Sequence, residues 1–198
     1  MTEPADAVGV VLAGGASRRF GSDKALAEID GRSIAARTAD LLATVCDEVL
    51  VADRERHLLD RRPSIADGPG AGPAAAILGA RRARPGTRLL ALACDLPAVP
   101  ASLLRALLAV AEPDLVLPRW SGGWEPLVAV YGPGALAALE DRVEKGRLSL
   151  HGLFSVDGLV IHPLEGVELE RHGDPAELFA NLNTRQALAD YLSRGRRS

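Results

Sequence analysis

Short apolar runs alternate along the chain with longer stretches in which apolar residues recur every three to four positions. Continuous apolar runs are typical of strands buried on both faces, and the longer spacing is typical of amphipathic helices. The runs that we expect to form strands are 8–12 (VGVVL), 48–52 (EVLVA), 89–94 (LLALAC), 114–118 (DLVLP) and 126–131 (PLVAVY).

Helices are expected between these strands. The first begins near Ser33 and places Ile34, Leu41, Leu42 and Val45 on one face. A Gly/Pro loop leads into an alanine-rich helix within 68–83. Further helical segments are expected at 102–110, at 134–143, in a short turn opened by Asp174, Pro175 and Glu177, and from Asn183 or Thr184 to about Ser193.

This order of elements predicts an α/β fold with a mostly parallel central sheet. The 198 residues suffice for one well-buried domain and are too few for two ordinary ones. We therefore expect a single domain over residues 1–198, with its core from about residue 8 to residue 191.

Composition narrows the classes of partner and environment. A net charge of -3 gives no general basic field for nucleic acid, and no apolar run is long enough to span a membrane. The acidic N-terminus does not resemble a secretory signal, so we expect the protein in the cytoplasm. Cys46 and Cys94 lie in apolar surroundings, which favours reduced, buried thiols over a disulfide framework or a zinc site.

A glycine-rich basic segment, LAGGASRRFGSDKA at 12–25, directly follows the first expected strand. Open α/β sheets bind ligands at the carboxyl ends of their strands, and glycines let backbone N–H groups approach phosphate oxygens. The spacing matches neither a P-loop nor a dinucleotide fingerprint, and a plain turn with a solvated basic face is the alternative. The residues suited to phosphate are Gly14, Gly15, Arg18, Arg19 and Lys24.

A carboxylate follows the most continuously apolar strand in CDLP, 94–97. Asp95 would point into the same crevice as the glycine-rich segment, where it can bind Mg²⁺ together with substrate phosphates. The alternative is that Asp95 caps a turn ahead of Pro97.

Two further segments carry candidate ligand residues. Asp67 lies in a loop that can wrap a ring or a ribose, or can simply be a loop before a helix. Asn181 and Asn183 alternate and can face a common side if their segment is extended, whereas Asn183 can also be the N-cap of the last helix. Trp120 and Trp124 flank a glycine pair and either form a substrate wall or pin a loop.

Taken in order, LAGGASRRFGSDKA, the loop with Asp67, CDLP, EPLVAVY and NLNT resemble the molybdenum cofactor guanylyltransferase family from about residue 8 to residue 191. The resemblance implies a Rossmann-like, three-layer α/β/α nucleotidyltransferase domain of the glycosyltransferase-A type, with a mostly parallel, mixed sheet. It also implies Mg²⁺-dependent transfer of GMP from GTP to the terminal phosphate of molybdenum-loaded molybdopterin. Molybdoenzyme maturation proteins are the expected protein partners.

By this resemblance, the nucleotide side of the site is formed by Leu12, Ala13, Gly14, Gly15 and Asp67. Lys24 would bind phosphate, Asp95 would bind Mg²⁺, and Arg18 or Arg19 would take the β- and γ-phosphate oxygens. Asn181 and Asn183 match an Asn pair on the pterin side. Since the attacking phosphate is already ionised, no general base is needed.

The sequence departs from the family pattern at three positions. Phe20 stands where the family usually has Met, Ala76 replaces the second Gly of GPLAG, and Val51 replaces an Asn that some relatives carry. These departures bear on which nucleobase the protein recognises, not on the phosphate chemistry. A cytidylyl or sugar-phosphate nucleotidylyltransferase, or a non-catalytic nucleotide-binding chaperone, therefore remains an alternative, although GG after LA favours the guanylyl branch by resemblance.

Overall fold

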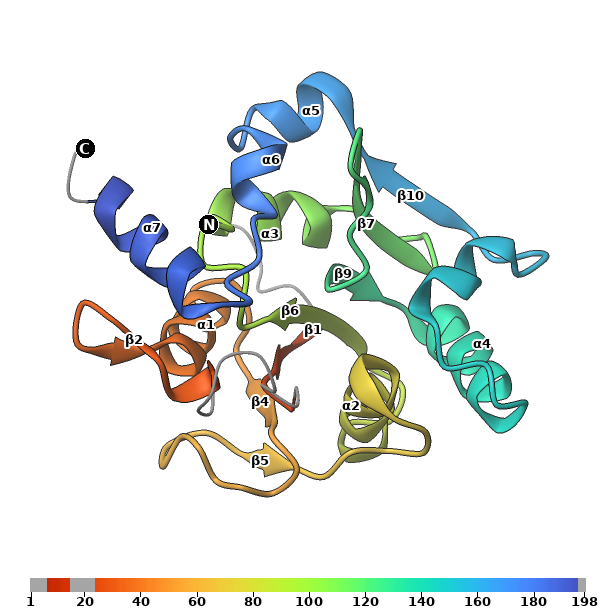
Figure 1. Ribbon diagram of the computed structural model, residues 1–198. Coiled ribbons are helices and arrows are strands. Elements are labelled where there is room, and N and C mark those ends of the chain that lie inside the picture. The colour runs from red at the N-terminus through yellow and green to blue at the C-terminus, as the bar shows by residue number, and fades with distance from the viewer. Residues whose placement is uncertain (1–6, 15–23, 196–198) are drawn as a thin grey trace.

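The computed structural model describes residues 7–14 and 24–195, and one central sheet runs through them (Figure 1). Its strands follow the order β10-β7-β9-β6-β1-β4-β5, with β8 paired to β7. The strands are β1 (Ala7–Leu12), β4 (Val49–Ala52), β5 (Ser64–Ile65), β6 (Arg88–Ala93), β7 (Leu115–Trp120), β8 (Gly123–Trp124), β9 (Val128–Tyr131) and β10 (Ile161–Leu164), and a separate hairpin consists of β2 (Glu28–Ile29) and β3 (Arg32–Ser33). The five strands expected from the apolar runs are confirmed as β1, β4, β6, β7 and β9.

The sheet is mixed, as expected. Strand β1 pairs in parallel with β4 and β6, whereas β9 is antiparallel to both β6 and β7. The start of β9 therefore lies at the same edge as the ends of β1, β6 and β7. The hydrogen bond from Ala93 N to Leu127 O, 2.9 Å, joins the end of β6 to the segment just before β9. This carboxyl edge is where a parallel sheet binds its ligands.

Helices cover both faces of the sheet, which confirms the three-layer α/β/α arrangement. In Figure 1, α2 and α4 lie on one side of the sheet, and α1 and α3 lie on the other. Alternate residues of β1 enter the two apolar clusters, because successive strand side chains point to opposite faces. The helices are α1 (Ile34–Leu42), α2 (Gly72–Ala83), α3 (Ala101–Ala109), α4 (Pro133–Glu144), α5 (Gly166–Glu170), α6 (Pro175–Leu178) and α7 (Arg185–Gly195), with 3-10 turns η1 (Lys24–Leu26) and η2 (Leu150–Ser155).

The first helix begins where the sequence predicts and ends earlier. Ser33 is its N-cap, and the Ser33 hydroxyl accepts a hydrogen bond from Ala36 N at 3.2 Å. The helix ends at Leu42, so Val45 lies in the turn that follows. Val45 nevertheless packs against the same apolar cluster as α1, which explains why its spacing imitates another helical turn.

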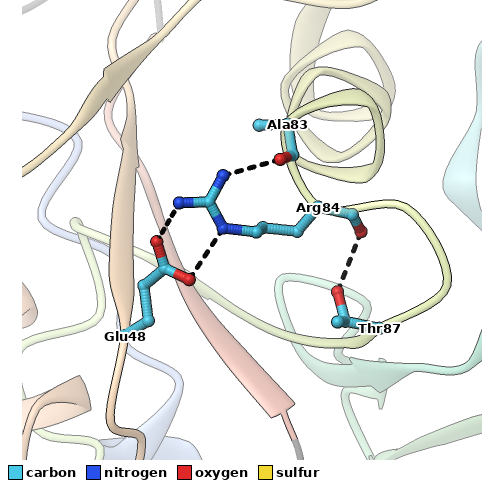
Figure 2. A network of polar contacts seen from close by, with 4 residues as sticks. All are labelled: Glu48, Ala83, Arg84 and Thr87. Atoms are coloured by element: carbon cyan, nitrogen blue, oxygen red, sulfur yellow. Dashed lines mark hydrogen bonds and ion pairs between the residues drawn. The ribbon is translucent and has the colours of Figure 1, made fainter.

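An ion-pair network joins the end of α2 to the start of β4 (Figure 2). Arg84 donates from Nε to Glu48 Oε2 at 2.8 Å, pairs through Nη2 with Glu48 Oε1, and donates from Nη1 to Ala83 O at 2.7 Å. Thr87 Oγ1 donates to Arg84 O at 2.8 Å, which fixes the turn between α2 and β6. The hydrogen bonds from Arg84 hold the pKa of Glu48 below its usual value.

Within residues 7–14 and 24–195, no helix combines the length and the apolar character that crossing a bilayer requires.

Candidate functional site

Three of the predicted site residues meet at the carboxyl edge of the sheet. Lys24 Nζ, at the start of η1, donates to Asp95 Oδ2 at 2.6 Å and to Asn183 Oδ1 at 2.7 Å. The side chains of Lys24 and Asp95 are 13% and 18% exposed. The Lys24–Asp95 pair is thus mostly withdrawn from water, where charge–charge interactions are stronger than at an open surface, whereas Asn183 is exposed. We call these residues the Lys24–Asp95–Asn183 cluster.

Asp95 lies two residues after the end of β6, and its side chain contacts Lys24. Leu182 N donates to the Asp95 carbonyl at 2.9 Å, so the C-terminal segment is fastened beside the strand. The carboxylate accepts from Lys24 through Oδ2, and no residue in the described ranges donates a hydrogen bond to Oδ1. One carboxylate oxygen therefore remains for a ligand.

Asp95 fits Mg²⁺ chemically. Mg²⁺ in phosphate-transfer sites is commonly held by one or two carboxylates, with waters and substrate phosphates completing the shell. No group of three or more His, Cys, Asp or Glu residues suited to a metal occurs in the described part of the chain. Asp95 is a single carboxylate of the kind that such a Mg²⁺ site uses.

The last helix resolves one alternative left open by the sequence. Thr184 Oγ1 accepts from Ala187 N at 3.1 Å, so Thr184 caps α7 and leaves the Asn183 side chain to contact Lys24. Asn181 behaves differently: its Nδ2 donates to Phe179 O at 3.5 Å, and Asn183 N donates to Asn181 O at 3.0 Å. The segment is therefore turned, not extended, and only Asn183 joins the cluster.

A second group lies where β1 ends, beside the loop before α2. A Cβ built on Gly14 would lie 3.7 Å from Asp67 Oδ1 and 3.6 Å from Arg54 Nε, so these two side chains approach the Gly14 backbone closely. Arg54 Nε donates to Asp67 Oδ2 at 2.8 Å. Asp67 Oδ1 is buried and has no hydrogen-bond partner among the described residues. Such an acceptor is suited to a ligand hydroxyl or N–H group.

The Asp67 loop is held by close packing on α2. Gly68 N donates to Ala75 O at 2.7 Å, and a Cβ on Gly79 would lie 2.1 Å from Ala66 O. Only glycine at position 79 allows the loop backbone to rest directly on the helix. Gly79 thus sets the position of the loop that carries Asp67.

The Asp53–Ser64 loop contributes residues that the sequence analysis missed. Arg54 pairs with Asp67, and Arg56 Nη2 donates to Ala13 O at 2.8 Å. Arg54, Glu55 and His57 have φ of 62°, 58° and 52°, a left-handed conformation that costs energy for residues other than glycine.

The buried carboxylate of Asp53 holds this loop in place. It accepts from Leu58 N at 2.9 Å and from Ser64 Oγ. A short run of charged residues in an irregular loop gave no periodic signal that could have identified these contacts.

In the described part of the predicted nucleotide loop, backbone groups already form hydrogen bonds with other strands and turns of the protein. Cys94 N donates to Leu12 O at 3.4 Å, and Ala13 N donates to Ala52 O at 3.1 Å. The predicted residues Gly15, Arg18 and Arg19 lie outside the described residues. Gly14 is the residue of this backbone stretch that lies beside Asp67 and Arg54.

Trp120 and Trp124 hold loops in place through side-chain contacts. Trp120 donates from Nε1 to Glu125 Oε1 at 3.0 Å and contacts the Phe179 ring, with 5.9 Å between ring centroids. Trp124 stacks on Phe154 at 4.7 Å. Burial raises the pKa of Glu125, and the hydrogen bond from Trp120 opposes that rise. The hairpin carrying both tryptophans thus contacts two separate parts of the C-terminal half.

Comparison with known proteins gives a consistent result. A family model described as a MobA-like NTP transferase domain matches residues 9–155. The molybdenum cofactor guanylyltransferase of Desulfosudis oleivorans is 30% identical over 194 residues, which covers 92% of the chain and 93% of that protein. The molybdenum cofactor biosynthesis bifunctional protein of Synechocystis is 36% identical over 137 residues, and there the match covers 65% of the chain and only 40% of the longer relative.

A solved structure shares the fold over nearly the whole chain. The molybdopterin-guanine dinucleotide biosynthesis protein A of Archaeoglobus fulgidus superposes with a TM-score of 0.79 at 22% identity, covering 97% of this chain and all (100%) of that one. The expected glycosyltransferase-A type nucleotidyltransferase fold is confirmed.

Proposed function

The chain belongs to the MobA-like NTP transferase family and is a nucleotidyltransferase, and we propose that it transfers GMP from GTP to the terminal phosphate of molybdenum-loaded molybdopterin. Relatives named molybdenum cofactor guanylyltransferase support both the donor and the acceptor. The observation that carries the proposal is the Lys24–Asp95–Asn183 cluster, which lies at the ligand-binding edge of the sheet together with Gly14 and Asp67.

The proposed chemistry is a direct displacement at phosphorus. A terminal phosphate oxygen of the acceptor forms a bond to the α-phosphorus of GTP, while the bond from that phosphorus to the bridging oxygen breaks and pyrophosphate leaves with the electron pair. The attacking oxygen is already ionised, so the protein supplies alignment and positive charge instead of a base.

Lys24 supplies that charge. Its ammonium group is held by two oxygen acceptors, Asp95 Oδ2 and Asn183 Oδ1, so it is oriented before substrate arrives. A fixed cation of this kind stabilises the charge that builds on the α-phosphate and the leaving pyrophosphate without reorganising during the reaction. Asp67 Oδ1 accepts a hydrogen bond from the nucleoside, with Arg54 holding the carboxylate in place.

Asp95 is the proposed protein ligand for Mg²⁺, through the oxygen that Lys24 leaves unused. When bound, Mg²⁺ supplies positive charge that neutralises phosphate oxygens. Arg18 and Arg19 remain proposed partners of the β- and γ-phosphates.

The test is pyrophosphate release by the purified protein with Mg²⁺ and molybdenum-loaded molybdopterin, with GTP, CTP, ATP and UTP offered separately. We expect pyrophosphate release with GTP and with none of the other three nucleotides, and we expect this release to stop when molybdopterin is omitted. A preference for CTP would assign the chain to the cytidylyl branch instead. Tight GTP binding without pyrophosphate release would indicate a binding protein and overturn the proposal.

We also propose that the reaction takes place in the cytoplasm and that molybdoenzyme maturation proteins receive the product. Cys46 and Cys94 are both buried and form no disulfide, which agrees with a reducing compartment. Cell fractionation followed by co-purification with maturation proteins tests both statements.

A further inference from the structure

A chain of contacts links the β7–β8 hairpin to the Lys24–Asp95–Asn183 cluster. Trp120 is the last residue of β7, and its ring contacts the ring of Phe179, at 5.9 Å between centroids and 43° between planes. Phe179 opens the segment 179–183, which ends at the Asn183 side chain that accepts from Lys24. The hairpin therefore touches one end of the segment, and the ammonium group touches the other.

The segment is anchored to the apolar core by two side chains, Phe179 and Leu182. Phe179 and Leu182 are 5% and 3% exposed, and Leu182 N donates to the Asp95 carbonyl. Asn181 and Asn183 are exposed, and the Asn181 side chain bonds only within its own segment among the described contacts. Asn183 is the exposed end of this segment, so a shift of Phe179 beside Trp120 would move Asn183 relative to Lys24.

Trp120 is itself held in one orientation. Its indole N–H donates to Glu125 Oε1 at 3.0 Å, across the β8 turn, and Glu125 N in turn donates to Pro118 O at 3.1 Å. A partly buried indole with its N–H satisfied is a rigid packing surface, because the hydrogen bond fixes the ring angle.

We propose that Trp120 is a positioning residue for nucleotidyl transfer: it holds the segment 179–183 so that Asn183 keeps the Lys24 ammonium group oriented beside Asp95. Trp120 acts through its ring contact with Phe179. The inference rests on the proposed function for its kinetic consequence, but its structural part is testable without any substrate.

The chain offers an internal reporter for this test, since it contains only two lysines, Lys24 and Lys145. Lys145 lies on the surface at the end of α4, paired with Asp141 at 2.7 Å, and its side chain is 59% exposed. Acetylation of the native protein with an N-hydroxysuccinimide ester, followed by peptide mass spectrometry, gives the ratio of Lys24 to Lys145 modification. This ratio reports how firmly Lys24 is held.

The expected result for Trp120→Ala is a rise of about threefold or more in this ratio, because the lysine leaves its partners part of the time. In the transfer assay, kcat should fall about 10- to 100-fold with little change in KM for GTP, since displacement of a positioned group by about 1 Å has effects of this size. Trp120→Phe keeps the ring contact and should retain most of both properties.

Trp124→Ala is the matched control, because it removes a tryptophan from the same hairpin whose ring contact is with Phe154 instead. It should leave the acetylation ratio and kcat near the wild-type values. An equal rise in the ratio for Trp124→Ala would mean that the hairpin acts only through general stability, and would overturn the proposal.

A folded Trp120→Ala protein with wild-type acetylation ratio and kcat would also overturn it. If Trp120→Ala does not fold, Phe179→Leu removes the same ring contact from the other side with less loss of volume, and the same two readouts apply. If the wild-type protein fails to transfer GMP, the proposed function fails, but the acetylation ratio still decides whether Trp120 positions Lys24.

Discussion

Lys24 Nζ lies 2.6 Å from Asp95 Oδ2, although 71 positions separate the two residues in the sequence. The glycine-rich segment after β1 and the turn after β6 thereby share one charged pair. Asn183 adds a second acceptor from a third part of the chain. The two acceptors hold the lysine ammonium group in one orientation, which is the arrangement that the proposed phosphate chemistry requires.

Replacement of Lys24 by Met should lower kcat for nucleotidyl transfer about 100-fold or more, because a single oriented charge near developing phosphate charge has an effect of this size. Pyrophosphate release at saturating GTP measures it. Lys145→Met removes the only other lysine, from an exposed position, and should leave kcat unchanged. A folded Lys24→Met protein with near-normal turnover would remove Lys24 from the mechanism.

Substitutions of Asn181 and Asn183 should have different effects on kcat, although the two residues share one local sequence pattern. Asn183→Ala removes an acceptor from Lys24 and should lower kcat about tenfold, whereas Asn181→Ala removes only a weak bond within its own segment. Parallel measurement of kcat and KM for the two variants checks this. Equal effects would show that Asn181 also reaches the reacting groups, for example by contact with the acceptor.

Gly79→Ala, a substitution inside helix α2, should weaken nucleotide binding. The added Cβ would meet Ala66 O at 2.1 Å, so the loop carrying Asp67 must move or the helix must shift, at a cost of about 1–3 kcal/mol. We expect a lower melting temperature and a higher Kd for GTP by calorimetry. Asp67→Asn supplies the comparison, since it should raise Kd for GTP with little change in melting temperature.

The thiol of Cys46 should be inert in the folded protein. Burial, with a smaller contribution from Asp47, raises the pKa of Cys46 to about 11, and the residue is 4% exposed. At about pH 8 the thiolate, which is the reactive form, is only about one part in a thousand. Iodoacetamide labelling of the Cys46 peptide should therefore be slow in the native protein and fast in denaturant; rapid native labelling would mean that the turn after α1 opens.

The Glu48–Arg84 pair should make the free energy of unfolding depend on pH in the acidic range. Hydrogen bonding to Arg84 lowers the pKa of Glu48 in the folded state, so the folded protein favours the ionised form more than the unfolded chain does. The stabilisation is present above the unfolded pKa of about 4.3 and is lost as the pH falls through the lowered folded pKa.

Glu48→Gln should therefore lower the melting temperature slightly near neutral pH, and the difference from wild type should vanish in strong acid. Thermal unfolding followed by circular dichroism from about pH 7 to pH 2.5 measures it. Asp141→Asn, which breaks the exposed pair with Lys145, is the control and should have a smaller effect at neutral pH. A difference that grows towards low pH would contradict the assignment.

The sequence by itself determined the central strands, the order of βα units and the end of the sheet where the site lies. Continuous apolar runs specify β1 and β6 because both strands are buried on both faces. Asp95 could be chosen because it directly follows the most apolar of these runs. The Ser33 cap of α1 also depends on neighbouring residues alone.

Only the tertiary structure decided which candidates meet. Asn181 and Asn183 have the same local pattern, and the turn at 181–183 and the fastening of Leu182 to Asp95 bring one of them to Lys24 and not the other. Arg54 and Trp120 reach the site through Asp67 and Phe179, partners far along the chain or in an irregular loop. Periodicity records which face of an element is buried; which residues from distant segments come within hydrogen-bond reach depends on strand order and loop packing, which no local pattern encodes.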